Sequence, residues 1–149
     1  MPMGGLYYEQ FSVGQRFEHV LRRTVTEADN LIFSALTHNP AALHLDEEYM
    51  KGTEFGTRIV NSAFTLALMV GISVGDASLR TKIANLGWDE VRLPNPVFEG
   101  DTIYSQSEVL EKRESKSRPD VGIVRVRTIG YNQDGKTVIG FVRTVMVFK

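Results

Sequence analysis

The chain has 149 residues, of which 42% are hydrophobic and 23% are charged, and its formal net charge is −1. This length suits one domain with a sizeable core, so we expect a single domain over residues 1–149. A charge this close to zero produces no broad field to attract nucleic acid or an anionic membrane, so an anionic ligand needs a local basic patch. The chain has no cysteine, which excludes disulfides and thiolate zinc sites and suits a reducing compartment.

Neither the N-terminal segment nor the most apolar stretch predicts export or membrane insertion. The segment MPMGGLYYEQF lacks the basic stretch and apolar run of a secretory signal. The most apolar stretch, Ala63 to Val74, falls well short of the about 20 residues that span a bilayer. It predicts a buried core helix, and we expect a cytoplasmic protein without a membrane segment.

The first elements in chain order are a strand and a helix. A strand is predicted from Arg16 to Val25, where polar residues interleave with a β-branched end. Thr26 then begins T-E-A-D, which resembles a capping box with Asp29 in the glutamate position. Asn39-Pro40 ends the helix that follows, because proline disfavours helical geometry in the preceding residue. The apolar residues expected to form the buried face of this helix are Leu31, Ile32, Ala35 and Leu36.

Two more helices are predicted before the midpoint of the chain. The segment LDEEYM predicts a short helix with Asp46 as its cap. Gly52 and Gly56 bracket a loop, and the next helix begins near Asn61 or Ser62. Apolar residues cover nearly the whole circumference of that helix, so we expect it to be buried on all sides, most simply by a sheet wrapped around it.

The second half of the chain predicts that sheet. The segment N-Q-D-G, residues 132–135, is typical of a tight turn between the last two strands. The order of strand, helices and then antiparallel strands predicts an α+β fold, in which a long curved antiparallel sheet wraps around a buried central helix. This arrangement is the hot-dog architecture. The four long segments rich in Val, Ile, Thr and aromatic residues are Lys82–Leu93, Thr102–Lys112, Gly122–Tyr131 and Thr137–Phe148.

The chain has three histidines as candidates for chemistry at neutral pH. His19 lies among polar and charged residues of the first strand, where a structural or solvent-exposed role is expected. His38 and His44 flank the Asn39-Pro40 break, and loops beside rigid elements often carry reactive groups. From position alone, both catalysis and the capping of a helix end fit these two residues.

The stretch FSALTHNPAALHLDEEYM, residues 33–50, resembles the signature of the MaoC-like dehydratases and (R)-specific enoyl-CoA hydratases. Residues 55–68, FGTRIVNSAFTLAL, resemble the family's entry into the central helix, and residues 96–102, PVFEGDT, resemble one of its strand starts. The similarity therefore spans nearly the whole chain. In an ungapped alignment with the signature, the matching residues are Phe33, Leu36, Thr37, Leu43, His44 and Asp46.

This resemblance implies a hot-dog hydro-lyase that adds water to an enoyl-CoA thioester or removes it from a 3-hydroxyacyl-CoA. It also implies a homodimer with composite sites, and we expect no metal ion and no cofactor. The family's substrates include fatty enoyl-CoAs and short branched or dicarboxylic acyl-CoAs, such as mesaconyl-CoA and methylmalyl-CoA.

The chain departs from the family's pattern at the presumed site. The family's catalytic Asp falls on Asn39, and its Gly at the start of the central helix falls on Ser62. The family's Asn-Pro pair falls on Ala41-Ala42. Because the amide of Asn39 cannot act as a base, the two-group acid–base pair is not carried over intact.

The resemblance assigns the remaining chemistry to one histidine and a helix start. His44 is expected to relay the proton, and Asn39 to hold the water or the substrate hydroxyl. The backbone N–H of Ser62 or Ala63 would stabilise the enolate, because the first amide groups of a helix lack partners and lie at its positive end. Asn61, in place of the family's His or Gln, is expected to line the acyl pocket.

Two sets of cations are candidates for binding the substrate. Lys112, Arg113, Lys116 and Arg118 form a basic cluster in EKRESKSRPD, where Arg113 and Arg118 are candidate ligands of the CoA diphosphate. The interleaved acidic residues also fit a solvated hairpin end. Arg58, just before the central helix, is a candidate partner for a distal carboxylate of the substrate.

Two other functions fit the same fold. A hot-dog thioesterase commonly uses a carboxylate on or beside the central helix, but after Ser62 the chain has no Asp or Glu until Asp76. A non-catalytic acyl-CoA-binding domain would bind the ester without turnover. The hydratase is favoured because His44 occurs together with both flanking blocks.

Overall fold

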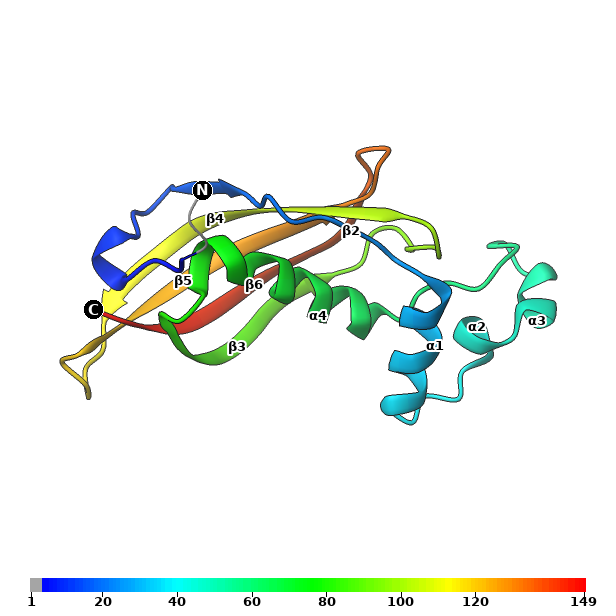
Figure 1. Cartoon of the computed structure of the whole chain (residues 1–149), viewed down its shortest axis with the longest axis horizontal. Coiled ribbons are helices and arrows are strands. Elements are labelled where there is room, and N and C mark those ends of the chain that lie inside the picture. Colours follow the sequence, from blue (N-terminus) through cyan, green and yellow to red (C-terminus); the bar gives the residue numbers. More distant parts are fainter. Residues whose placement is uncertain (1–3) are drawn as a thin grey trace.

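The computed structural model describes residues 4–149. Residues 1–3, which belong to the N-terminal segment predicted not to be a secretory signal, lie outside the described residues. Short strands and three small helices fill the first third of the chain, followed by one longer helix and four long strands (Figure 1). The helical elements are η1 (Tyr8–Gln10), α1 (Glu27–Leu36), α2 (Ala42–Leu45), α3 (Glu47–Lys51), α4 (Ser62–Ser73) and η2 (Val74–Ser78). The strands are β1 (Arg16–Glu18), β2 (Arg23–Thr24), β3 (Lys82–Arg92), β4 (Thr102–Glu114), β5 (Val121–Tyr131) and β6 (Thr137–Phe148).

The sheet is antiparallel, with the strand order β1-β4-β5-β6-β3, and β2 pairs with β4 beside β1. The four long strands agree closely with the predicted segments. The predicted turn joins β5 to β6, where the Oδ1 of Asn132 accepts hydrogen bonds from the backbone N–H groups of Asp134 and Lys136 at 3.0 and 3.1 Å. Gly135 takes a left-handed φ of 73°, which glycine adopts without strain.

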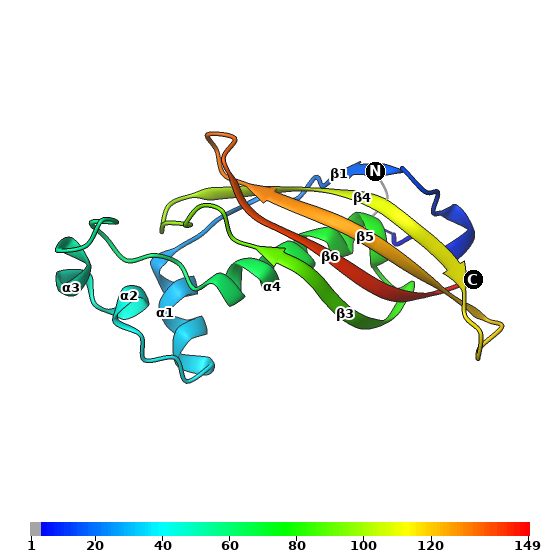
Figure 2. The same ribbon diagram turned by 180° about the vertical axis from the view of Figure 1, so that it is seen from behind.

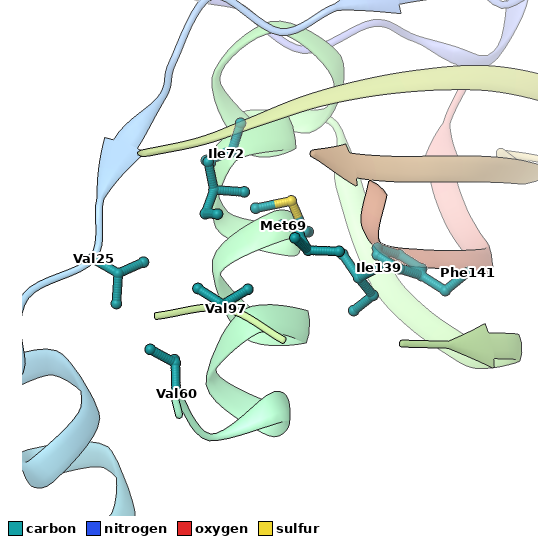
Figure 3. Close-up of a cluster of buried hydrophobic side chains, with 9 residues drawn as sticks. Val25, Val60, Met69, Ile72, Val97, Ile139 and Phe141 are labelled. Carbon is teal, nitrogen blue, oxygen red and sulfur yellow. The ribbon is translucent and has the colours of Figure 1, made fainter. Parts of the chain in front are cut away.

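Helix α4 lies along one face of the curved sheet, and the helical end formed by α1, α2 and α3 stands beyond one end of the sheet (Figures 1 and 2). Met69 and Ile72 of α4 pack against Ile139 and Phe141 of β6 in the main apolar cluster (Figure 3). A curved antiparallel sheet packed around one helix is the hot-dog architecture, so the predicted fold class is confirmed.

The prediction that α4 is buried on all sides is wrong for the single chain. Met69 is fully buried, but the small residues Ala63, Ala67 and Gly71 are exposed along one side of the helix. The sheet covers α4 from one direction only, and β3 forms one of the two edges of the sheet. One copy of the chain therefore leaves this side of α4 exposed.

The single strand predicted over residues 16–25 is broken into β1 and β2. Strand β1 ends at Glu18, and the next residue, His19, still donates its backbone N–H to the Ser105 carbonyl oxygen at 3.0 Å. Its imidazole is buried, with Nδ1 2.7 Å from Asp76 Oδ1 and Nε2 2.8 Å from Ser107 Oγ. The next residue, Val20, is 75% exposed. His19 therefore ties the N-terminal strand to η2 and to β4, as expected of a structural residue.

Helix α1 begins as predicted but faces the opposite way. Thr26 and Asp29 form the capping box, with the Thr26 N–H donating to Asp29 Oδ2 at 2.8 Å. The prediction of its buried face is wrong, because Ile32 and Leu36 are exposed. The buried residues of α1 are Asn30 and Ser34. Their side chains are held by hydrogen bonds to the segment before α4, which outweigh the pull of the apolar residues toward the core.

Candidate active site

His44 lies in α2, a short helix that the sequence did not predict, and its side chain is buried. Its ring Nδ1 is 2.8 Å from the carbonyl oxygen of Ile59. Since a carbonyl oxygen only accepts, Nδ1 carries the proton of the neutral ring, and Nε2 is left with a lone pair. This tautomer equips His44 to accept a proton at Nε2.

The start of α4 follows directly on Ile59. Asn61 is the N-cap, and its Oδ1 accepts a hydrogen bond from the Ala63 N–H at 3.1 Å. The amide of Ala63 is therefore already occupied. Within residues 4–149 the Ser62 N–H has no hydrogen-bond acceptor. Of the two predicted oxyanion donors, Ser62 is therefore the one that remains available at the positive end of the helix.

Asn30 of α1 joins these two parts of the site and was not predicted from the sequence. Its Nδ2 lies 3.3 Å from the carbonyl oxygen of His44 and 3.2 Å from that of Ile59, and its Oδ1 accepts from the Asn61 N–H at 2.9 Å. A polar residue on the expected solvent face of a helix gives no signal of burial, so the sequence offered no sign of a role for Asn30.

Asn61 is tied to the same helix through its amide nitrogen, which donates to Ser34 Oγ at 3.3 Å. Both polar atoms of its side chain are thus bonded within the protein, and Asn61 is 5% exposed. Through these two bonds the Asn61 side chain holds the start of α4 against α1.

Asn39 lies in the turn between α1 and α2, where its Oδ1 accepts from the Ala41 N–H at 3.0 Å. With that oxygen occupied by its own turn, the amide of Asn39 offers Nδ2 as a hydrogen-bond donor. Within the described residues Nδ2 has no partner. The preceding residue, His38, is exposed and has a left-handed φ of 56°.

A cavity of about 420 Å³ opens beside the first turn of α4. Ser62 and Thr65 line it on the helix side, and it extends over the loop between β3 and β4. No charged side chain lines this cavity. The remaining lining residues are Phe55, Ile59, Val60, Leu93, Pro94, Asn95, Pro96, Val97 and Val138.

Arg58 precedes this segment, and its guanidinium contacts three carboxylates. Its Nη2 lies 2.7 Å from Glu27 and 3.2 Å from Glu99, and its Nε lies 3.4 Å from Glu47. The hydrogen bond to Glu27 raises the pKa of Arg58, with further contributions from the charges of Glu99 and Glu47, against the opposing effect of burial. The side chain is only 13% exposed, so Arg58 is already surrounded by negative charge before any substrate binds.

Arg113 and Arg118 do not meet the other candidates within one chain. Arg113 donates to the Glu114 carbonyl at 3.3 Å, and Arg118 forms an ion pair with Asp120 at 2.7 Å. They lie at and beside the turn between β4 and β5, at the opposite end of the long axis from α1 and α2 (Figure 1).

The described part of the chain contains neither a membrane-spanning helix nor a cluster of metal-binding side chains. Over residues 4–149 no helix is long and apolar enough to cross a membrane. Within the same range no group of three or more His, Asp or Glu side chains is arranged to hold a metal ion.

Comparison with known proteins agrees with this arrangement. The family model of the MaoC-like domain matches residues 9–132. The mesaconyl-CoA hydratase of Cereibacter sphaeroides is 34% identical over 97% of the chain, and the β-methylmalyl-CoA dehydratase of Chloroflexus aurantiacus is 32% identical over 97%. The chain spans 42% and 41% of the length of these two relatives.

A solved structure gives the same picture. The unliganded R-hydratase PhaJ1 of Pseudomonas aeruginosa superimposes with a TM-score of 0.81 at 29% identity. The match covers 97% of this chain and 87% of that chain.

Proposed function

The chain belongs to the MaoC-like domain family, and we propose that residues 1–149 form a single domain that catalyses the reversible hydration of an enoyl-CoA thioester. The observation that carries the proposal is the contact between the buried His44 ring and Ile59, just before the N-terminus of α4. A proton acceptor and a free helix amide are the two groups this reaction requires. The relatives named as CoA-ester hydratases and dehydratases support the same reaction class.

His44 moves the proton in this mechanism. Its Nε2 takes a proton from water as the oxygen attacks the β-carbon and the electrons of the double bond shift toward the thioester carbonyl. The resulting imidazolium then gives that proton to the α-carbon, which restores the neutral ring. The reverse sequence removes water from a 3-hydroxyacyl-CoA. Asn39 holds the water or the hydroxyl through Nδ2, because its Oδ1 is bonded to Ala41.

The enolate oxygen that forms in this step requires a fixed positive dipole. The Ser62 N–H at the start of α4 supplies it, together with the partial positive charge of the helix N-terminus. The Ala63 N–H is bonded to the Asn61 side chain and contributes only through the helix. A donor of this kind that is lost costs about 3 kcal/mol of transition-state stabilisation.

We propose that the acyl group enters the cavity beside Ser62 and Thr65, which has room for a short, branched acyl chain. The names of the two relatives make mesaconyl-CoA and methylmalyl-CoA the first substrates to test. Arg58 is proposed to hold the segment before α4 through its three carboxylates, which replaces the expected contact with a distal carboxylate of the substrate.

We further propose that the working unit is a homodimer joined at β3. This strand is one edge of the sheet, and four large apolar residues on it or directly after it are exposed: Leu86, Trp88, Val91 and Leu93. A two-fold axis that pairs two β3 edges antiparallel would bring the β4–β5 turn of one chain toward the α1–α2 end of the other. Arg113 and Arg118 would then reach the CoA phosphates across the dimer.

The absence of cysteine suits a reducing compartment, which supports a cytoplasmic location for this activity. The proposed hydration uses only side chains and backbone amides of the chain.

The test is to incubate the purified chain with a panel of enoyl-CoA and 3-hydroxyacyl-CoA esters that includes mesaconyl-CoA and methylmalyl-CoA. We expect the enoyl thioester absorbance to change without release of free CoA thiol. Thiol release in place of hydration would identify a thioesterase, and binding without any turnover would identify an acyl-CoA-binding domain. Either of these results would overturn the proposal.

A further inference from the structure

Asn30 occupies the junction between the two halves of the proposed site. Its side chain is fully buried, with 0% exposure. Its amide nitrogen reaches the carbonyl oxygens of His44 and Ile59, and its amide oxygen accepts from the Asn61 N–H. One planar group therefore contacts the backbone of the proton acceptor, the carbonyl that orients its ring, and the cap of the helix that carries the oxyanion donor.

The Ile59 carbonyl oxygen is the point through which Asn30 acts on the ring. This oxygen accepts both from His44 Nδ1 at 2.8 Å and from Asn30 Nδ2 at 3.2 Å. The direction of the carbonyl decides where the ring points, because the Nδ1–H bond is strongest when it is in line with a lone pair. Asn30 helps to fix that direction through its own hydrogen bond to the same oxygen.

Asn30 is itself anchored through Glu99, whose Oε1 accepts from Nδ2 at 3.2 Å. The other oxygen of Glu99 is paired with Arg58 at 3.2 Å. The Asn30 NH₂ group has two protons for three acceptors, which are Glu99 Oε1 and the carbonyl oxygens of His44 and Ile59. The three contacts together, and no single bond, therefore define its position. The charge on Glu99 makes its bond with Asn30 stronger than one between neutral groups.

We propose that Asn30 is a positioning residue for the hydration reaction, holding the His44 ring and the first amide groups of α4 in register. This inference rests on the proposed function. Asn30 touches neither water nor substrate in this role. A misplacement of reacting groups by about 1 Å costs on the order of 100-fold in rate, so the loss of Asn30 should act on the chemical step and not on substrate affinity.

The experiment compares Asn30→Ala and Asn30→Asp with the control Asn132→Ala. Asn30→Asp keeps the volume and the acceptor for Asn61 but removes both donors, so it serves where Asn30→Ala does not fold. Asn132 is also a buried asparagine that binds backbone N–H groups, but it lies in the β5–β6 turn. All are assayed far below their unfolding temperatures.

We expect both Asn30 variants to lose about 100-fold in kcat with KM within about threefold of wild type, and Asn132→Ala to keep kcat while its unfolding temperature falls. A second readout does not depend on activity. With three histidines in the chain, ¹⁵N NMR of the imidazoles should show His44 as the Nδ1–H tautomer in wild type and as a mixture in Asn30→Ala, with His19 unchanged.

The two readouts separate the inference from the proposed function. An inactive wild-type protein would overturn the proposed function, and the His44 tautomer would still decide the role of Asn30. The inference is wrong if Asn30→Ala and Asn30→Asp keep both kcat and the wild-type His44 spectrum. It is also wrong if Asn132→Ala loses as much kcat as they do, because the loss would then follow stability alone.

Discussion

The Nδ1 of His44 lies 2.8 Å from the carbonyl oxygen of Ile59, so the histidine that follows the Asn-Pro break is held against the segment that leads into α4. This contact brings together two blocks of sequence that were predicted separately. It also fixes which ring nitrogen can accept a proton, because the carbonyl oxygen accepts a hydrogen bond from Nδ1–H and leaves the lone pair on Nε2. The backbone thus determines which ring nitrogen of His44 carries the lone pair.

Removal of the His44 ring should abolish most of the hydratase activity. We expect His44→Ala to lower kcat by at least about 100-fold, because general acid–base catalysis contributes 10² to 10⁴. The measurement is the rate of hydration of the best substrate from the ester panel. His38→Asn is the matched control, since His38 is exposed and asparagine tolerates its left-handed φ of 56°. A His44→Ala enzyme within tenfold of wild type would rule out this role.

The capping box of α1 should make stability depend on pH. Burial alone raises the pKa of Asp29, but hydrogen bonds from Thr26 and Arg23 outweigh it and lower that pKa below its ordinary value. Because the folded-state pKa is the lower one, the ionised carboxylate stabilises the fold above the unfolded-state pKa of about 4, and this contribution is lost as the pH falls through the folded-state value.

Asp29→Asn should therefore lower the free energy of unfolding by about 1 kcal/mol at neutral pH, and the difference from wild type should shrink as the pH falls below about 4. Urea unfolding at a series of pH values measures this difference. Glu54→Gln, at an exposed position in the loop after α3, is the control and should show no such trend. A difference that stayed constant with pH would show that the charge of Asp29 is not involved.

Loss of Arg58 should destabilise the protein and slow every substrate equally. In Arg58→Gln, three carboxylates lose their shared cation, and Glu99 keeps only its hydrogen bond with Asn30. We expect the free energy of unfolding to fall by about 2 kcal/mol. We expect kcat for a dicarboxylic and a monocarboxylic enoyl-CoA to fall by the same factor. A rise in KM confined to the dicarboxylic ester would instead show that Arg58 binds the substrate.

A charge on the open edge of the sheet should separate the proposed dimer. Trp88→Glu introduces a carboxylate at a side chain that is 44% exposed on β3, where it would be buried against a second copy. Sedimentation equilibrium should give the mass of a dimer for wild type and of a monomer for the variant. Val13→Glu, at a residue that is 64% exposed in the N-terminal turn, should leave the mass unchanged. A dimeric Trp88→Glu protein would place the interface elsewhere.

Residues that obey local rules were predicted well from the sequence. The four long strands, the Asn132 turn, the Thr26 box and the start of α4 follow from β-branched runs, turn residues and caps. The predicted site residues His44 and Ser62 are linked through Ile59, which accepts a hydrogen bond from the His44 ring and precedes Ser62 by three residues. Their catalytic roles remain predictions.

The features that the sequence could not reveal depend on long-range polar contacts. Asn30 is a polar residue in a helix whose apolar face was assumed to point inward, yet its partners lie in segments 14 to 69 residues away. Arg58 was taken as a free cation because its three acidic partners are spread along the chain. The sequence predicted the start of α4 near Asn61 or Ser62, and only the structure shows that the Asn61 side chain occupies the Ala63 N–H.

The buried imidazole of His19 also has a consequence for how the chain assembles. Its two bonds connect residues 57 and 88 positions apart, to Asp76 and Ser107. Neither partner is in place until α4 and the central strands have formed, so residues 4–20 should dock late in folding, after a slow search for distant contacts. Pulse-labelled amide exchange should find β1 protected after β5 and β6, and simultaneous protection would refute this order.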